Sequence, residues 1–357
     1  MERIWWERVP DAIAFVEDVA NALLDEKSVL LQEAHRIPWY SGFAFAVQEE
    51  VEQKDASKGV ERISQVENPG KYLFEEYCIP EIRALYRPSR TFANFLAEND
   101  GVSLHSKYFW VEVETAEALK AWTDFVSEYL VGRGKQKKEA AAFVLEWRGE
   151  RSKISRKGIR SMSLDEYINE YDRMVFSMLA SSTVREEVGM KHYLAELAAN
   201  VAGNDVELCA ECLDRYQEFL ENPWGTLREI TENAWRSNGE PFVGPADEAE
   251  AERLIWRAQI KTLYPLVEEF RGAFARKYTK AIAKELPVTA PFGETFDDPK
   301  DVELGTLVFM VASGRLKVKA NEYARLVKCK DARNKLAHLR ALGIEEIREL
   351  LGSGFIC

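Results

Sequence analysis

Hydrophobic and polar positions follow two patterns in the first half of the chain. Short, largely apolar runs alternate with longer stretches in which apolar residues recur every three or four positions. The runs predict strands and the longer stretches predict helices. The predicted strands are 28–32, 60–66, 105–113, 141–147 and 159–164, and the predicted helices are 4–24, 42–53, 72–85 and 116–130, the last with Thr115 as its N-cap.

From about residue 163 onward the pattern is helical. A segment rich in Gly, Pro, Ser and Asn at 237–245 is the best candidate for a linker. The predicted helices are 165–179, 184–201, 205–220, 226–235, 247–284, 299–312, 319–328, a helix from Asp331 to about Gly343, and 345–351.

These patterns predict an α/β plus all-α protein. Strands alternating with helices favour a mostly parallel sheet in an N-terminal α/β domain, residues 1–175. A helical region follows at 176–236, and residues 246–357 are expected to form a C-terminal helical bundle.

Composition and charge narrow the classes of partner. The 357 residues carry a net charge of −12, so general DNA binding is not expected and polyanion binding needs a local basic patch. One basic stretch, 132–138, is predicted to be a loop, either simply solvated or in contact with a polyanion. No run of about 18 apolar residues predicts a membrane span, and five scattered cysteines suggest reduced thiols, so we expect a soluble cytoplasmic protein.

The most distinctive motif is the hexapeptide 333–338, Arg-Asn-Lys-Leu-Ala-His. With Asp331 as N-cap, Asn334 and His338 would share one helix face, and Arg333 would lie in the first turn. The amino end of a helix attracts phosphate. His338 could then transfer a proton, and Arg333 could stabilise negative charge on a phosphodiester in its transition state.

The last 110 residues resemble the HEPN superfamily (higher eukaryotes and prokaryotes nucleotide-binding), which includes metal-independent ribonucleases. Arg333, Asn334 and His338 match the motif of that family residue by residue. The resemblance implies that an RNA 2′-hydroxyl attacks the adjacent phosphate while Arg333 steadies the charge, Asn334 places the phosphate and His338 transfers the proton. It also implies a homodimer with a shared cleft, and neither a metal nor a cofactor.

The α/β half resembles a P-loop ATPase core that lacks its phosphate loop. The segment after the first predicted strand, 33–42, is bulky where a phosphate loop needs glycines. Together the two resemblances suggest an accessory or effector subunit of a bacterial anti-phage defence system, with RNA and the proteins of a defence complex as partners. The alternative is a non-catalytic scaffold that dimerises or docks a larger defence enzyme.

Three further groups invite a functional interpretation. Glu146, at the end of a predicted strand, stands where such ATPases bind magnesium, and His35, Arg36 and Trp39 could line a pocket. For His35, Arg36 and Trp39, a role in packing is the favoured prediction. Cys209-Ala210-Glu211-Cys212 lacks a second ligand pair for zinc, so we expect buried thiols on one helix face.

Overall fold

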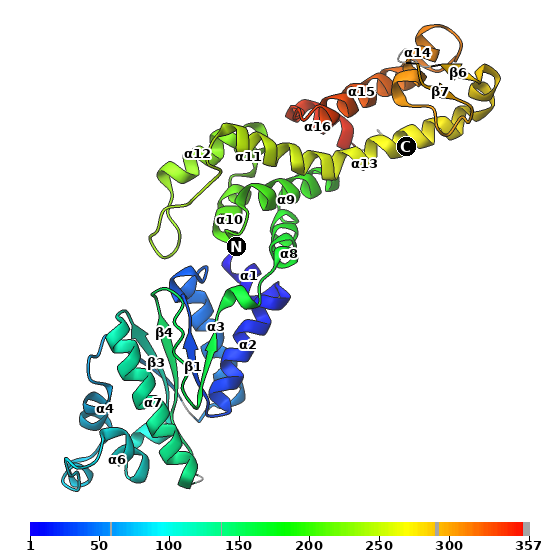
Figure 1. Cartoon of the computed structure of the whole chain (residues 1–357). Coiled ribbons are helices and arrows are strands. Elements are labelled where there is room, and N and C mark those ends of the chain that lie inside the picture. Colours follow the sequence, from blue (N-terminus) through cyan, green and yellow to red (C-terminus); the bar gives the residue numbers. More distant parts are fainter. Residues whose placement is uncertain (58, 137, 290–292, 353–357) are drawn as a thin grey trace. The chain divides into compact units, whose positions relative to one another are not determined.

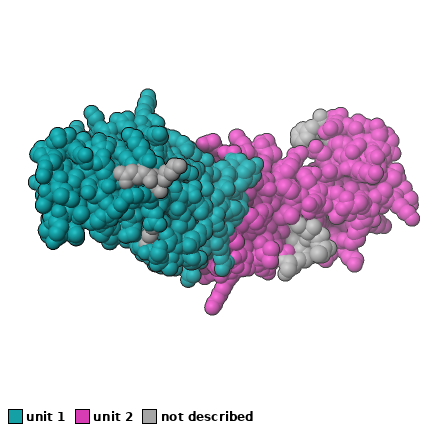
Figure 2. Space-filling view, turned by 90° about the horizontal axis from the view of Figure 1, so that it is seen from below, with its two compact units in different colours: residues 1–176, 236–240 teal, residues 177–235, 241–357 magenta. Residues whose placement is uncertain are grey.

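The computed structural model describes residues 1–57, 59–136, 138–289 and 293–352. These residues form two compact units, coloured separately in Figure 2. Unit 1 comprises residues 1–176 and 236–240, and unit 2 comprises residues 177–235 and 241–357. The short segment 236–240 belongs to unit 1 because it packs on the loop after the first strand: Asn238 donates to the carbonyl of His35 at 2.7 Å.

Unit 1 is built on a five-stranded sheet in the order β2-β3-β4-β1-β5. All neighbouring strands are parallel, as the alternation of strands and helices predicted. The strands are β1 Ser28–Leu31, β2 Val60–Ile63, β3 Tyr108–Val113, β4 Ala142–Trp147 and β5 Ile159–Met162. Each lies within one of the five predicted runs, so the predicted α/β fold class is confirmed.

The central strands are largely apolar on both sides because helices cover both faces of the sheet. Every residue of β1 and β4 is buried, whereas the edge strands β2 and β5 are partly exposed. Helices α2 Pro10–Leu24 and α3 Tyr40–Lys54 cover one face, and α7 Ala116–Gln136, α6 Phe92–Glu98 and α4 Pro69–Tyr77 lie on the other (Figure 1). Strands made of nearly continuous apolar residues are typical of such a three-layer arrangement.

Two predicted helices of unit 1 are wrong as single helices, and proline is the cause in both. The stretch 4–24 divides into α1 Glu2–Arg8 and α2, with Val9 extended before Pro10. The stretch 72–85 divides into α4 and α5 Pro80–Arg83, with Ile79 extended before Pro80. Proline disfavours the helical conformation of the preceding residue, which overrides the apolar periodicity.

The predicted basic loop 132–138 is also largely wrong. Thr115 accepts from the amide of Ala118 at 3.1 Å, as predicted, but α7 continues to Gln136. Arg133, in its last turn, is buried and donates to the carbonyl of Glu139 at 2.7 Å. That contact stabilises an end of the helix that its two glycines would otherwise weaken; Lys137 lies outside the described residues.

Unit 2 is mainly helical, which confirms the predicted helical C-terminal region. Its first helices are the C-terminal part of α8 Glu170–Ser181, α9 Val188–Ala202, α10 Val206–Asp214, α11 Tyr216–Glu221 and α12 Pro223–Asn233. The predicted helix 205–220 is two helices, α10 and α11, which meet at Arg215. Cys209 and Cys212 are buried in α10, as predicted, and burial raises the pKa of the Cys209 thiol to about 12.

The rest of unit 2 is organised around α13 Glu248–Ile282, whose 35 residues span about 52 Å. Asp247 caps α13 by accepting from the amide of Glu250 at 2.8 Å. After a short hairpin, β6 Val288–Thr289 and β7 Thr295–Phe296, come α14 Leu304–Ala312, α15 Ala320–Ala337 and α16 Ile344–Leu351 (Figure 1). No helix in the described part of the chain is long and apolar enough to span a membrane.

Candidate functional site

The hexapeptide 333–338 lies at the carboxyl end of a helix, not at its amino end. Asp331 is inside α15, which begins at Ala320 and is continuous to Ala337. The prediction that Asp331 caps a separate helix is therefore wrong. The buried face explains the continuity, because it runs through the supposed break with three- and four-residue spacing: Leu326, Cys329, Ala332 and Leu336.

A Schellman cap ends α15 at the motif itself. The amide of Arg340 donates to the carbonyl of Lys335 at 2.9 Å, and that of Leu339 to the carbonyl of Leu336 at 3.2 Å. Leu339 adopts a left-handed backbone conformation with φ of 58°. His338 is the C-cap residue. This helix end carries partial negative charge, so the predicted attraction of phosphate by a helix amino end does not apply here.

Side chains of α13 hold the turn that follows α15. Trp256 donates from its indole nitrogen to the carbonyl of Leu336 at 2.8 Å. The buried side chain of Gln259 donates to the carbonyl of Leu342 at 3.0 Å and accepts from the amide of Leu342 at 2.6 Å. The nitrogen and the oxygen of this buried side-chain amide therefore each have a hydrogen-bond partner. The conformation of residues 338–342 is consequently fixed by contacts with a second helix.

Asn334 and His338 lie together, as predicted. Both side chains are exposed and line one cavity of about 360 Å³, with Asp331, Lys335, Arg340 and Glu346. Lys335 is paired with Glu346 at 2.7 Å. Among the described residues, neither Asn334 nor His338 has a side-chain hydrogen bond or ion pair. Both are available to a ligand in this cavity.

Arg333 does not join them within one chain. Its guanidinium pairs with Glu303 at 3.5 Å and lines a different cavity, of about 680 Å³. That cavity has six carboxylates and three cationic groups in its lining, so its net charge repels phosphate. The carboxylates are those of Glu268, Glu294, Asp297, Asp298, Asp301 and Glu303, and the cations are those of Arg271, Lys300 and Arg333.

Arg340 was missed in the sequence. A helix continuing to Gly343 would place Arg340 about 200° around the axis from His338, on the opposite side. Because α15 ends at Ala337, the chain turns and both residues line the same cavity. The usual sequence signal for such a stop is a glycine after the helix, and here that position is Leu339.

No family model matches this sequence, and no curated protein matches it.

The other predicted positions of the α/β half are engaged in contacts within unit 1. Glu146 is buried, accepting from the indole of Trp110 at 3.0 Å and pairing with Arg148 at 2.7 Å. Burial, and then the neighbouring Glu146, raise the pKa of Tyr40 well above its usual value. Both carboxylate oxygens of Glu146 are therefore engaged by side chains of unit 1.

The loop after β1 is likewise packed against its own unit. Arg36 pairs with Glu33 at 2.7 Å, and the amide of Trp39 donates to Ser237 at 3.1 Å. The ring of Trp39 lies 5.9 Å from that of Phe176. A short 3₁₀ turn, Ala34–Arg36, follows β1.

Proposed function

We propose that unit 2 carries the ribonuclease site of an RNA-directed effector or accessory subunit, of the kind found in bacterial anti-phage defence. The observation that carries the proposal is the shared cavity of Asn334, His338 and Arg340. An imidazole, an amide and a guanidinium with no competing ion pair among the described residues suit a phosphodiester.

The chemistry needs no group that the chain lacks. The RNA 2′-oxygen bonds to the adjacent phosphorus as His338 accepts its proton, and the bond from phosphorus to the 5′-oxygen breaks. The products are a 2′,3′-cyclic phosphate and a 5′-hydroxyl, whose proton comes from water or from His338 of a second copy. Asn334 places a non-bridging oxygen, and Arg340 stabilises the charge that develops on it.

A cleavage assay with the full chain tests the role of His338. His338→Ala should lower the rate of cleavage of single-stranded or transfer RNA in chelator by about 100-fold or more, the usual contribution of a general acid–base group. The control is His192→Ala, which removes an exposed histidine from α9 of the same unit. New ends should carry a cyclic phosphate. Equal RNA integrity with His338→Ala and with the parent, at high protein concentration, would exclude the nuclease.

A second proposal is a non-catalytic scaffold that dimerises or docks a larger enzyme. It is supported by the ion pair of Arg333 with Glu303 and by the separation of Arg333 from His338 into two cavities. In that case Arg333→Ala, Asn334→Ala and His338→Ala would all leave RNA intact. Of these three changes, only Arg333→Ala removes an ion pair between described residues, and because that pair is partly exposed the loss of stability should be about 1 kcal/mol or less.

A further inference from the structure

A basic segment stands out in unit 1 of this acidic protein. Residues 132–160 contain ten Lys and Arg against three Glu, a net charge of +7 within the segment. Six of these cations pair with carboxylates, whereas Lys135, Lys153 and Lys157 form an exposed basic surface with no ion pair among the described residues. At about 0.1 M salt the Debye length is about 10 Å, so distant carboxylates are largely screened from a ligand here. We propose that this surface binds the phosphate backbone of single-stranded RNA. The proposal goes beyond the cleavage site of unit 2 and does not depend on cleavage.

The first support is a groove with a lysine on each wall. Lys135, from the last turn of α7, and Lys157, from the segment before β5, line a cavity of about 420 Å³. Leu130 and Val131 form an apolar part of the lining. The volume is in the range of small-ligand pockets and suits one nucleotide at a time, with ribose or base on the apolar part and phosphate at the lysines.

Glycine keeps this groove open. Gly158 has φ of 84°, and a Cβ atom there would lie 2.9 Å from Cδ1 of Leu130. A larger residue would therefore be strained in its backbone and would push against the α7 wall.

The second support is the order of the segment that leads to Lys157. Exposed and less exposed residues alternate from 151 to 157, so Arg151, Lys153 and Lys157 face solvent while Ile154 packs on the core. In an extended chain Lys153 and Lys157 are at most about 14 Å apart. A row of cations of this kind continues the groove along a strand of nucleic acid.

The third support is that Arg156 and Arg160 are ion-paired, whereas the three lysines are not in the described ranges of the chain. Arg156 pairs with Asp124 of α7 at 2.7 Å, and Arg160 pairs with Asp18 of α2 at 3.0 Å. By contrast Lys135, Lys153 and Lys157 are exposed and make no ion pair within the described part of the chain. Arg156 and Arg160 hold the segment in place, and the three lysines are left to contact an external phosphate.

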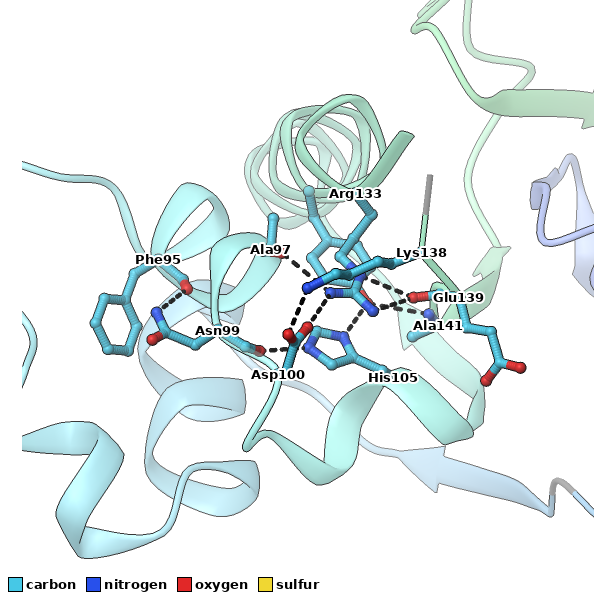
Figure 3. A network of polar contacts seen from close by, with 10 residues as sticks. Phe95, Ala97, Asn99, Asp100, His105, Arg133, Lys138, Glu139 and Ala141 are labelled. Carbon is cyan, nitrogen blue, oxygen red and sulfur yellow. Dashed lines mark hydrogen bonds and ion pairs between the residues drawn. The ribbon is translucent and has the colours of Figure 1, made fainter. Parts of the chain in front are cut away.

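The wall that carries Lys135 is also fixed. Arg133 precedes Lys135 by two residues in the last turn of α7. Its guanidinium donates to the carbonyl of Glu139 at 2.7 Å and to that of Ala97 at 3.3 Å, and it pairs with Asp100 (Figure 3). Asp100 also pairs with Lys138. Because the end of α7 is anchored in this way, the backbone that carries Lys135 needs little ordering when a ligand binds.

The test measures binding of a fluorescent single-stranded RNA of about twelve nucleotides by anisotropy. The full chain carries His338→Ala so that no cleavage intervenes. Replacing Lys135, Lys153 and Lys157 by Gln should weaken binding by about tenfold or more at about 0.1 M salt. It should also reduce the slope of log affinity against log salt by about 2, since each phosphate contact on a single strand contributes about 0.7.

The matched control removes the same charge from the same unit. Lys27, Lys54 and Lys71 are 60%, 42% and 61% exposed and pair with Asp25, Glu50 and Glu75. Their triple change to Gln should leave affinity within about twofold, because those lysines already have partners.

Three outcomes would overturn the proposal: no binding by the parent, equal weakening by both triple variants, or displacement of RNA by inorganic triphosphate as effectively as by unlabelled RNA. The last would indicate a small polyphosphate ligand instead. Binding that depends on the three lysines, in a protein whose His338→Ala change has no effect on RNA integrity, would uphold this inference and refute only the nuclease.

Discussion

His105 is a buried histidine whose two ring nitrogens are both engaged. Nδ1 lies 2.8 Å from the hydroxyl of Tyr129. Nε2 lies 2.7 Å from the carbonyl of Asn99 (Figure 3). A carbonyl can only accept, so Nε2 donates to Asn99, and in the neutral ring Nδ1 accepts from the hydroxyl of Tyr129. The amide of Ala141 donates to the same hydroxyl at 3.0 Å. The neutral imidazole with a proton on Nε2 satisfies every partner.

This arrangement makes the stability of unit 1 dependent on pH. Burial lowers the pKa of His105 below its usual 6.5. As pH falls, the unfolded chain therefore takes up a proton before the folded one does. The contribution of His105 is full above about pH 6.5 and declines toward the folded pKa, by up to about 1.4 kcal/mol per pH unit.

Urea unfolding followed by tryptophan fluorescence, between about pH 5.5 and 7.5, measures this effect. His105→Gln should flatten the dependence of the unfolding free energy on pH, and His192→Gln, at an exposed site, should leave it as in the parent. Identical slopes in all three proteins would show that His105 does not carry the linkage.

At the scale of elements, the end of α15 combines a strong cap with an unfavourable residue. Leu339 occupies a left-handed position that glycine prefers, and its side chain is 71% exposed. Its burial therefore contributes little that could offset the backbone strain, which is about 1 kcal/mol for a non-glycine residue.

Leu339→Gly should stabilise unit 2 by about 1 kcal/mol, because it removes this strain and little apolar contact. Leu339→Ala retains the strain and should change stability by less than half as much. Thermal unfolding of the three proteins measures both. A loss of stability with Leu339→Gly would mean that the side chain is covered, for example by a second copy of the chain.

At the scale of the whole molecule, the two cavities that α15 helps to line bear on the oligomeric state. A site that uses both Arg333 and His338 needs them from different chains, because within one chain they line separate cavities. The nuclease proposal with all three motif residues therefore implies a dimer of twice the 40.9 kDa chain mass in solution.

Mixing variants tests whether such a composite site exists. Because Arg340 lines the cavity of His338 and Arg333 does not, Arg333→Ala should retain activity and Arg340→Ala should lose it. If Arg333 acts instead from a second copy, Arg333→Ala and His338→Ala are each inactive alone. An equimolar mixture of the two, in which half of the dimers are mixed and each of these has one intact cleft of two, then recovers about a quarter of parental activity. Light scattering gives the mass of each sample. Activity of Arg333→Ala alone, with a requirement for Arg340, would place the whole site within one chain.

Much of the architecture follows from the sequence by itself. The five strands were predictable because each is a short apolar run that can be recognised locally. A parallel sheet that helices cover on both faces buries every residue of its central strands, which are therefore mostly apolar. The placement of Asn334 and His338 beside one cavity was also predictable, because residues four apart share a helix face wherever the helix starts. Prolines at 10 and 80 could have predicted the two divided helices.

Only the tertiary structure decided which side chains share the cavity at the end of α15. Trp256 and Gln259 hold residues 336–342 from about 80 positions earlier in the chain. Periodicity reports which face of a helix is buried and is silent about such distant partners. Likewise, Lys135 and Lys157 are far apart in the sequence. They line one groove because α7 packs beside the segment before β5. Local pattern thus determined the elements, and long-range packing determined the sites.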